Sequence, residues 1–255
     1  MIPDSLKLHA FVLAVWNEAV PLQKQVDDLG RIGDSEEIDE YQFYVMRVGY
    51  SLAQIVTWME QLDHAVYYLS DFSYKKDAKD EGVNRAKHLL YSVENYLIRL
   101  QSVYDRALQL TNNVFHLGIE DSNVGHSAVI SNLKVSRTDV AGQLRAVKKE
   151  VERRAQERHA IVHRESHRDE DLRRLEMFYM FSEDTWNAKP GGPTFEGLCH
   201  MRSQLLKTVV AEKKKDFAEL NQSVFGKIEV LFAGLHSQYN KERGRLRLYV
   251  YGKDA

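Results

Sequence analysis

The chain has 255 residues, enough to bury a hydrophobic core, and its 44% hydrophobic and 28% charged residues exclude a disordered polypeptide. A formal net charge of −2 excludes a grossly basic nucleic-acid binder, and a single cysteine, Cys199, excludes an intrachain disulfide or a multi-cysteine zinc site. No apolar run approaches the roughly 20 residues of a membrane span and no signal peptide is readable, so we expect a cytoplasmic protein with no membrane partner.

Helical patterns dominate the first half of the chain. Residues 6–29 are expected to form a helix that Pro21 kinks or divides, because proline lacks the N–H that a helix interior needs. Apolar residues recur every three or four positions over 36–72, which predicts a long amphipathic helix. The polar stretch 71–82 is expected to be a loop, and a second long helix should follow over 84–115.

The second half begins with a Gly- and Asp-containing connection over 118–127. A third long helix is expected over about 138–164, and Ser166 or Asp169 could cap a short successor that ends near residue 181. The Pro- and Gly-rich run 186–193 is the strongest breaker in the chain, after which a helix is predicted to about residue 238. The tail from Arg245 to Tyr251 alternates polar and apolar residues, as in a short strand.

These elements predict an all-α fold, a bundle of long antiparallel helices. We expect one domain over 1–255. Its helical core should occupy 35–181 and include the helix at 138–164, and a long helix and tail should follow over 194–255.

Charge is distributed unevenly along the chain: residues 1–130 carry 11 Lys or Arg against 19 Asp or Glu, whereas residues 131–255 carry 24 against 18. The basic half contains three of the 10 histidines at spacings i, i+4 and i+8, which share a face of an unbroken helix: His159, His163 and His167. The arginines of the same segment are Arg153, Arg154, Arg158, Arg164 and Arg168.

Histidine and arginine together can supply the chemistry of metal-free RNA cleavage. Imidazole titrates near neutral pH, so it can remove a proton from the ribose 2′-hydroxyl or give one to the leaving 5′-oxygen. Guanidinium is a permanent cation that can hold phosphate and stabilise the charged transition state.

The run Arg158-His159-Ala-Ile-Val-His163 resembles the signature of HEPN domains (higher eukaryotes and prokaryotes nucleotide-binding). In that signature an Arg is followed directly by a polar residue, and four to six residues separate the Arg from a His. Arg153 and Arg154 also reach His159 at an allowed spacing, but only Arg158 has the polar residue after it. The stretch 96–106 is similar to the helix before the motif helix in a bacterial branch of the family.

The resemblance implies a bundle of four or five helices, commonly a homodimer in which the two motif helices meet at the twofold axis. It also implies a metal-independent endoribonuclease with a toxin, stress or defence role and no cofactor. The products would carry 2′,3′-cyclic phosphate and 5′-hydroxyl ends. The implied partners are RNA, a second copy of the chain, and an antitoxin or regulatory protein. Other members of the family are inactive and only bind RNA, nucleotide or protein.

We assign His163 as the acid or base, Arg158 as the phosphate clamp and His159 as an orienting or second acid–base group. On a straight helix His159 and His163 differ by about 40°, but Arg158 and His163 differ by about 140°, so a second protomer is expected to complete the site.

Six further residues are weaker candidates. Contacts with RNA phosphates are expected from Arg154, Arg164 and Arg168. The residues expected to line the cleft, or else to form a polar layer inside the bundle, are Arg99, Tyr104 and Asp105.

Two alternatives for the His- and Arg-rich segment remain open. The segment could be a solvated helix face, because acidic residues stand at i,i+4 positions throughout it. The three histidines could instead bind a metal ion if the helix continued past Arg164. We expect no metal, because no cysteine is near and no Glu follows the first His as in zinc-protease helices.

Overall fold

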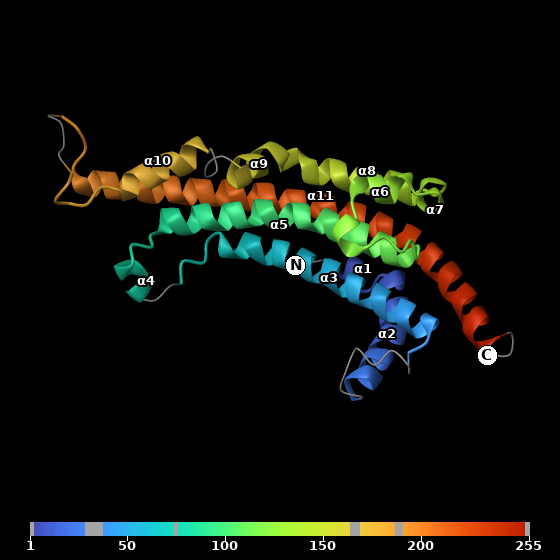
Figure 1. Cartoon of the computed structure of the whole chain (residues 1–255). Helices are drawn as coiled ribbons and strands as arrows, with labels where there is room; N and C mark the ends of the chain where they lie inside the picture. Colours follow the sequence, from blue (N-terminus) through green and yellow to red (C-terminus); the bar gives the residue numbers. More distant parts are fainter. Residues whose placement is uncertain (1–2, 29–37, 74–75, 164–168, 187–190, 253–255) are drawn as a thin grey trace. The chain divides into compact units, whose positions relative to one another are not determined.

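The computed structural model describes residues 3–28, 38–73, 76–163, 169–186 and 191–252. Every regular element in these ranges is a helix, which confirms the predicted all-α class (Figure 1). None of the described helices is long and apolar enough to cross a bilayer. The elements are α1 (Asp4–Lys7), α2 (Ala10–Asp28), α3 (Glu40–Tyr68), α4 (Lys76–Asp80), α5 (Arg85–Val114), η1 (Asp121–Asn123), α6 (His126–Ser131), α7 (Leu133–Ser136), α8 (Val140–Val151), η2 (Glu152–Arg154), α9 (Ala155–His163), α10 (Glu170–Tyr179) and α11 (Phe195–Tyr251).

The chain divides into two compact units, each with its own packed interior. Unit 1 comprises residues 1–60, 101–152 and 222–255, and unit 2 comprises 61–100 and 153–221. Each unit contains one segment of α3, one of α5 and one of α11. That the whole chain is a single domain stays a prediction.

Aromatic rings fill the interior of unit 1. The rings of Tyr44 and Tyr239 stack with centroids 5.9 Å apart and planes within 16°, and Phe11 meets Tyr239 edge-on at 5.9 Å. All three side chains are almost fully buried, and the Tyr44 hydroxyl donates to the carbonyl oxygen of Val114 at 2.9 Å. Unit 1 is thereby closed around rings from α2, α3 and α11.

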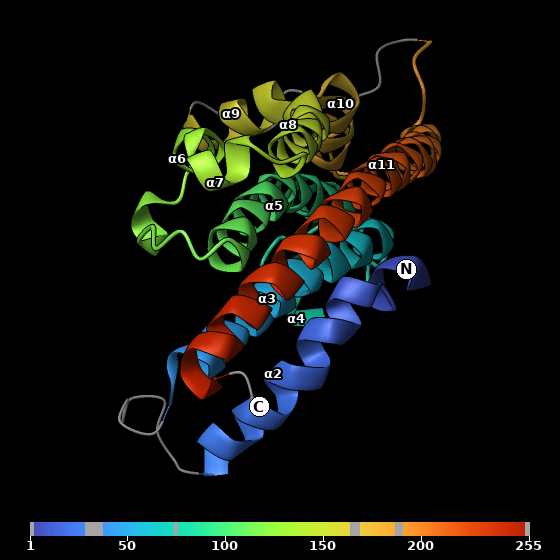
Figure 2. The same cartoon turned by 90° about the vertical axis from the view of Figure 1, so that its right-hand side faces the viewer.

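Glycine lets helices of unit 1 approach closely at two positions. A Cβ at Gly49 of α3 would lie 2.6 Å from the Cβ of Ala19 in α2, and the two helices run side by side there (Figure 2). A Cβ at Gly234 of α11 would lie 2.4 Å from the Gln143 side chain of α8. A larger residue at Gly49 would therefore separate α2 from α3, whereas one at Gly234 would first displace the flexible end of the Gln143 side chain.

Unit 2 is built around one stacked ring pair with a polar partner. The ring centroids of Tyr96 in α5 and Phe217 in α11 are 3.7 Å apart, and the two ring planes are within 8° of parallel. The Tyr96 hydroxyl donates to the Asn221 side chain at 2.9 Å, and the Asn221 amide donates to the Leu62 carbonyl at 3.1 Å. Because all these groups are buried, the layer joins α3, α5 and α11 in a fixed register.

Two predictions for the first half of the chain need correction. The N-terminal helix breaks at residues 8–9 rather than at Pro21, which lies inside α2. The stretch expected to be a loop before residue 82 contains the short helix α4. In the second half, α6 and α7 lie between 126 and 136, where no helix was predicted, because each is too short to show an amphipathic period.

The helix predicted over 138–164 is interrupted by the 3₁₀ turn η2. The buried apolar stripe of α8 ends at Val151, and no residue of η2 is buried. The charged residues of η2 therefore lack the apolar packing that stabilises α8. Asp169, one of the two expected caps, does cap α10, because its carboxylate accepts from the N–H groups of Asp171 and Leu172 at 3.0 Å.

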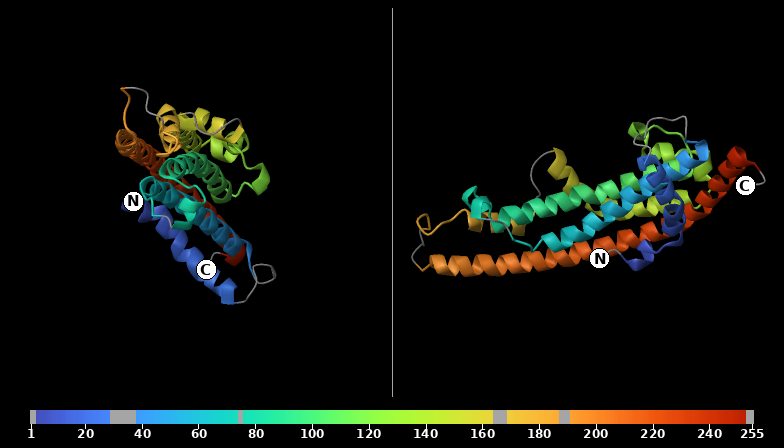
Figure 3. Two further views of the ribbon diagram at one scale, coloured as in Figure 1. Left: turned by 90° about the vertical axis from the view of Figure 1, so that its left-hand side faces the viewer. Right: turned by 90° about the horizontal axis from the view of Figure 1, so that it is seen from below.

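The predicted C-terminal strand is wrong, because α11 continues unbroken to Tyr251 (Figure 3). The buried residues Tyr239, Glu242 and Leu246 follow helical spacing on one face. Arg245 pairs with Glu242 one turn earlier at 2.6 Å. A strand would have exposed Leu246 and broken this pair.

Candidate active site

Helix α9 of unit 2 carries the predicted cleavage motif. Arg158 is half-buried and His159 is exposed, and His163 is the last residue of the helix. The side chain of His163 and the whole of Arg164, His167 and Arg168 lie outside the described residues.

The α9 backbone is helical over the whole motif, so the angular relations expected of these positions apply. Positions 159 and 163 differ by about 40° around the helix axis and therefore share a face, whereas position 158 is about 140° from 163. A single α9 helix thus carries the two histidine positions on one face and the arginine position on another.

Arg154, predicted to contact RNA, is bound to two carboxylates within unit 2. Its Nη1 donates to Glu157 at 2.5 Å, and its Nη2 donates to Asp216 of α11. Burial by itself would lower the pKa of Arg154, but the hydrogen bonds from Asp216 and Glu157 raise it overall. Arg154 therefore ties the start of α9 to α11 as a charged pair.

A small cavity of about 250 Å³ lies beside this pair. Arg153 and Arg154 line it together with two acidic residues, Asp216 and Glu219. The carboxylates oppose binding of a phosphate at this spot, because they offset the arginine charge at close range. The cavity therefore fits a positioning role for Arg154 better than direct contact with RNA.

Arg99 is engaged by amide side chains of unit 2. Its Nε donates to Asn95 at 3.1 Å, and its Nη1 donates to Gln61 of α3. Asp105 is exposed and belongs to unit 1, as does the almost fully buried Tyr104. The contacts of Arg99 match the polar-layer alternative for this residue.

Tyr104 contacts a histidine that the sequence did not single out. The Tyr104 oxygen lies 2.5 Å from Nδ1 of His126. Burial raises the pKa of the Tyr104 hydroxyl, with smaller effects from Glu152 and Asp105 in the same direction. The hydroxyl therefore stays protonated, and it donates to Nδ1 when the neutral ring carries its proton on Nε2.

The His126 ring is expected to make stability depend on pH. Burial lowers the pKa of His126, and Lys148 and Arg145 lower it further, against an opposing effect of Glu152. The unfolded chain, with a histidine pKa of about 6.5, then binds more protons than the folded chain, so stability is full above that pH and falls as the pH drops below it. His126→Gln should flatten the pH dependence of the free energy of unfolding between about pH 7.5 and 5 in urea titrations.

His64→Gln is the matched control, because His64 is an exposed residue of α3. Burial also lowers the pKa of His9, but His9 is present in both variants and cancels in the comparison. An equal pH slope in His126→Gln and the wild type would contradict a lowered pKa of His126 in the folded chain.

No group of three or more His, Cys, Asp or Glu residues within the described ranges is placed to hold a metal ion. The histidine trio proposed as an alternative metal site includes His167 and the His163 side chain, which lie outside those ranges. That alternative stays a prediction.

Asp216 and His126 were not predicted as parts of any site. Asp216 lies 62 positions after Arg154, and His126 lies 22 after Tyr104. Neither stands in a motif, and each acquires its role only when separate helices pack together. Each is one of many polar residues in its part of the chain, so no signal in the sequence singles it out.

A family model described as Cthe2314-like HEPN matches residues 34–233, which include the whole of η2, α9 and α10. No curated protein and no solved structure matches the chain.

Proposed function

The chain belongs to the HEPN family, and from that premise we propose that it is a metal-independent endoribonuclease. The family match over 34–233 contains the motif from Arg158 to His163 on one helix, α9, and this observation carries the proposal. The biological role proposed is that of a toxin or of a stress or defence enzyme acting on RNA in the cytoplasm.

The proposed reaction needs one base, one acid and one cation. A base removes the proton of the ribose 2′-hydroxyl, and the 2′-oxygen attacks the adjacent phosphorus. The bond from phosphorus to the 5′-oxygen breaks, and that oxygen takes a proton from the acid. The products are a 2′,3′-cyclic phosphate and a 5′-hydroxyl, so the reaction consumes no water, and protein side chains supply its acid, base and cation.

His163 and His159 supply the acid and base in this proposal, since their positions share one face of α9. Arg158 neutralises charge that develops on the phosphate oxygens. It stands about 140° from position 163, so we propose a homodimer in which Arg158 of one protomer acts with His163 of the other.

The surrounding arginines differ in role. Arg154 is a positioning residue, because its pairs with Glu157 and Asp216 hold the start of α9 on α11. Arg164 and Arg168 are proposed to contact backbone phosphates of the bound RNA. An antitoxin or regulatory protein that covers α9 would silence the enzyme.

Incubation of the purified protein with total RNA in excess EDTA tests the proposal. We expect fragments to accumulate, because no step of the reaction uses a metal ion. RNA that binds without being cut would support the alternative, a catalytically inactive helical module that binds RNA, nucleotide or a protein partner. Cleavage that stops in EDTA and returns with an added divalent metal would favour the alternative metal site.

A further inference from the structure

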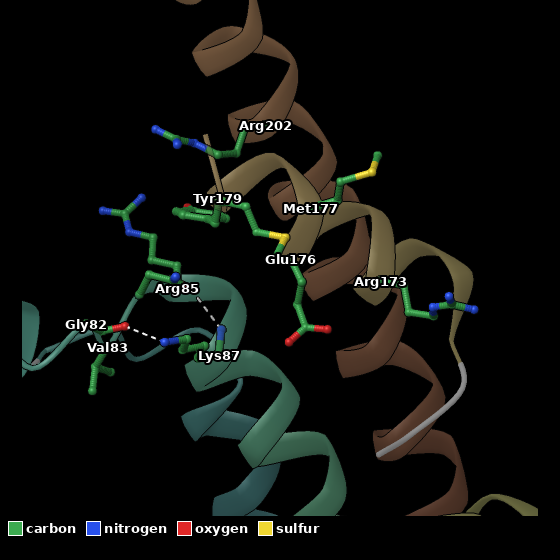
Figure 4. A pocket seen from close by; sticks show the side chains of 11 residues that line it. Gly82, Val83, Arg85, Lys87, Arg173, Glu176, Met177, Tyr179 and Arg202 are labelled. Atoms are coloured by element: carbon green, nitrogen blue, oxygen red, sulfur yellow. Dashed lines mark hydrogen bonds between the residues drawn. The ribbon is translucent and has the colours of Figure 1, made fainter. Parts of the chain in front are cut away.

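Unit 2 contains a second and larger cavity, about 960 Å³, between the start of α5, the helix α10 and the start of α11 (Figure 4). Glu176 is the single carboxylate in its lining. Four cationic side chains line it: Arg85, Lys87, Arg173 and Arg202. A volume of this size accommodates a small organic ligand. The excess of positive charge favours an anionic ligand.

The cations of this pocket are held by contacts that leave their charge available. The guanidinium of Arg202 lies 4.4 Å from the centre of the Tyr179 ring, and that of Arg85 lies 5.4 Å from the Phe72 ring. The Lys87 ammonium donates to the Gly82 carbonyl at 2.9 Å. Within the described part of the chain, no carboxylate lies at ion-pair distance from any of the four cations.

Helix α5 adds to the positive field, since its N-terminus forms one wall of the pocket. Asn84 acts as the cap, with its side-chain oxygen accepting from the Lys87 N–H at 3.0 Å. The first-turn N–H groups without helical partners and the helix dipole give this end a partial positive charge. This end of α5, together with Arg85 and Arg202, favours a ligand with phosphate oxygens over one with a single carboxylate.

The lining also includes side chains that fit a flat ring. Met180 is 80% exposed, unusual for such a side chain, and it follows the half-buried Tyr179 in the sequence. In Figure 4 the side chains of Arg85 and Arg202 both lie near the Tyr179 ring, Arg202 above it and Arg85 below and to its left in this view. Phosphate at the two guanidinium groups would therefore place an attached ring near the tyrosine.

We infer that this pocket binds a phosphorylated nucleoside, either as a free nucleotide or as the end of an RNA strand. The phosphates contact Arg85 and Arg202, and the base packs against Tyr179 and Met180. None of the pocket residues belongs to α9, so the site is separate from the proposed cleavage motif. Binding here can be present whether or not α9 cleaves RNA.

Isothermal titration calorimetry tests the inference with four probes: ATP, adenosine, inorganic tripolyphosphate, and a short single-stranded RNA with a 5′-phosphate. The RNA is titrated into His163→Ala so that it stays intact. ATP should bind the wild type at least about tenfold more tightly than adenosine or tripolyphosphate, because only ATP fills both parts of the pocket. If the RNA binds more tightly than ATP, the ligand is the end of a strand. If ATP binds more tightly than the RNA, the ligand is a free nucleotide.

The double variant Arg85→Gln/Arg202→Gln should weaken binding of the preferred probe about 100-fold, since two charged hydrogen-bond donors are lost. Arg174→Gln is the matched control, because Arg174 is exposed on α10 next to Arg173 but does not line the pocket. Thermal melting of each variant checks its fold. The inference is overturned if neither ATP nor RNA binds below about 1 mM, if tripolyphosphate equals ATP, or if the double variant binds like Arg174→Gln.

Discussion

Replacing His163 with alanine is expected to lower kcat/KM for RNA cleavage by about 10²- to 10⁴-fold, the range typical of a lost general acid or base. The fold should survive, because position 163 is the last residue of α9 and alanine is the residue most compatible with a helix. Cleavage of a defined RNA in EDTA gives the rate, and circular dichroism gives the helix content. His64→Ala, an exposed histidine of α3, should cleave like the wild type.

The dimeric site adds a sharper form of the same experiment. Arg158→Ala and His163→Ala chains should each be inactive alone. Mixed after subunit exchange, they should recover part of the wild-type rate, since one of the two shared sites keeps an intact Arg158 and an intact His163. Full activity of His163→Ala would remove that residue from the chemistry, and an inactive mixture would contradict the shared site.

Phe217→Ala is expected to lower the free energy of unfolding by about 3–5 kcal/mol. Phe217 is 1% exposed, and its ring stacks on Tyr96 at 3.7 Å. Removing the ring leaves a cavity beside the buried hydrogen bond from Tyr96 to Asn221. Asp216, which binds Arg154, directly precedes Phe217 on α11, so the loss should also loosen the attachment of α9.

Urea unfolding followed by circular dichroism measures this effect. Phe43→Ala is the matched control, because that ring is 50% exposed and contacts the Arg47 guanidinium at 5.6 Å. Phe43→Ala should lower the free energy of unfolding by less than about 1 kcal/mol. A loss below about 1 kcal/mol for Phe217→Ala as well would show that the stacked pair does not hold unit 2 together.

The long helices were predictable because burial repeats along them with a helical period. In α3 and α5 the same apolar face is buried from one end to the other, so local sequence and tertiary packing agree. The alternation at 245–251 led to the wrong prediction of a strand. Leu246 and Glu242 lie on the same buried face only because α11 continues as a helix through them. Alternation over seven residues cannot separate a strand from the end of a long helix.

The candidate site was predictable only where it is local. Arg158, His159 and His163 lie within six positions on one helix, so spacing alone places all three on α9 and puts the two histidine positions on one face. The Arg154–Asp216 pair and the pocket formed by Arg85, Arg202 and their neighbours join segments far apart in sequence. No local period encodes those contacts, because they depend on how α5, α9, α10 and α11 pack within unit 2.

The chemistry of the cut ends tests the proposed ribonuclease most directly. RNA is incubated with the wild type and with His163→Ala in EDTA, and the fragments are analysed for their 3′ and 5′ termini. The wild type should yield 2′,3′-cyclic phosphate and 5′-hydroxyl ends, and His163→Ala should yield almost none. Ends with a 3′-hydroxyl and a 5′-phosphate, or equal yields of fragments from both proteins, would contradict cleavage by the α9 motif.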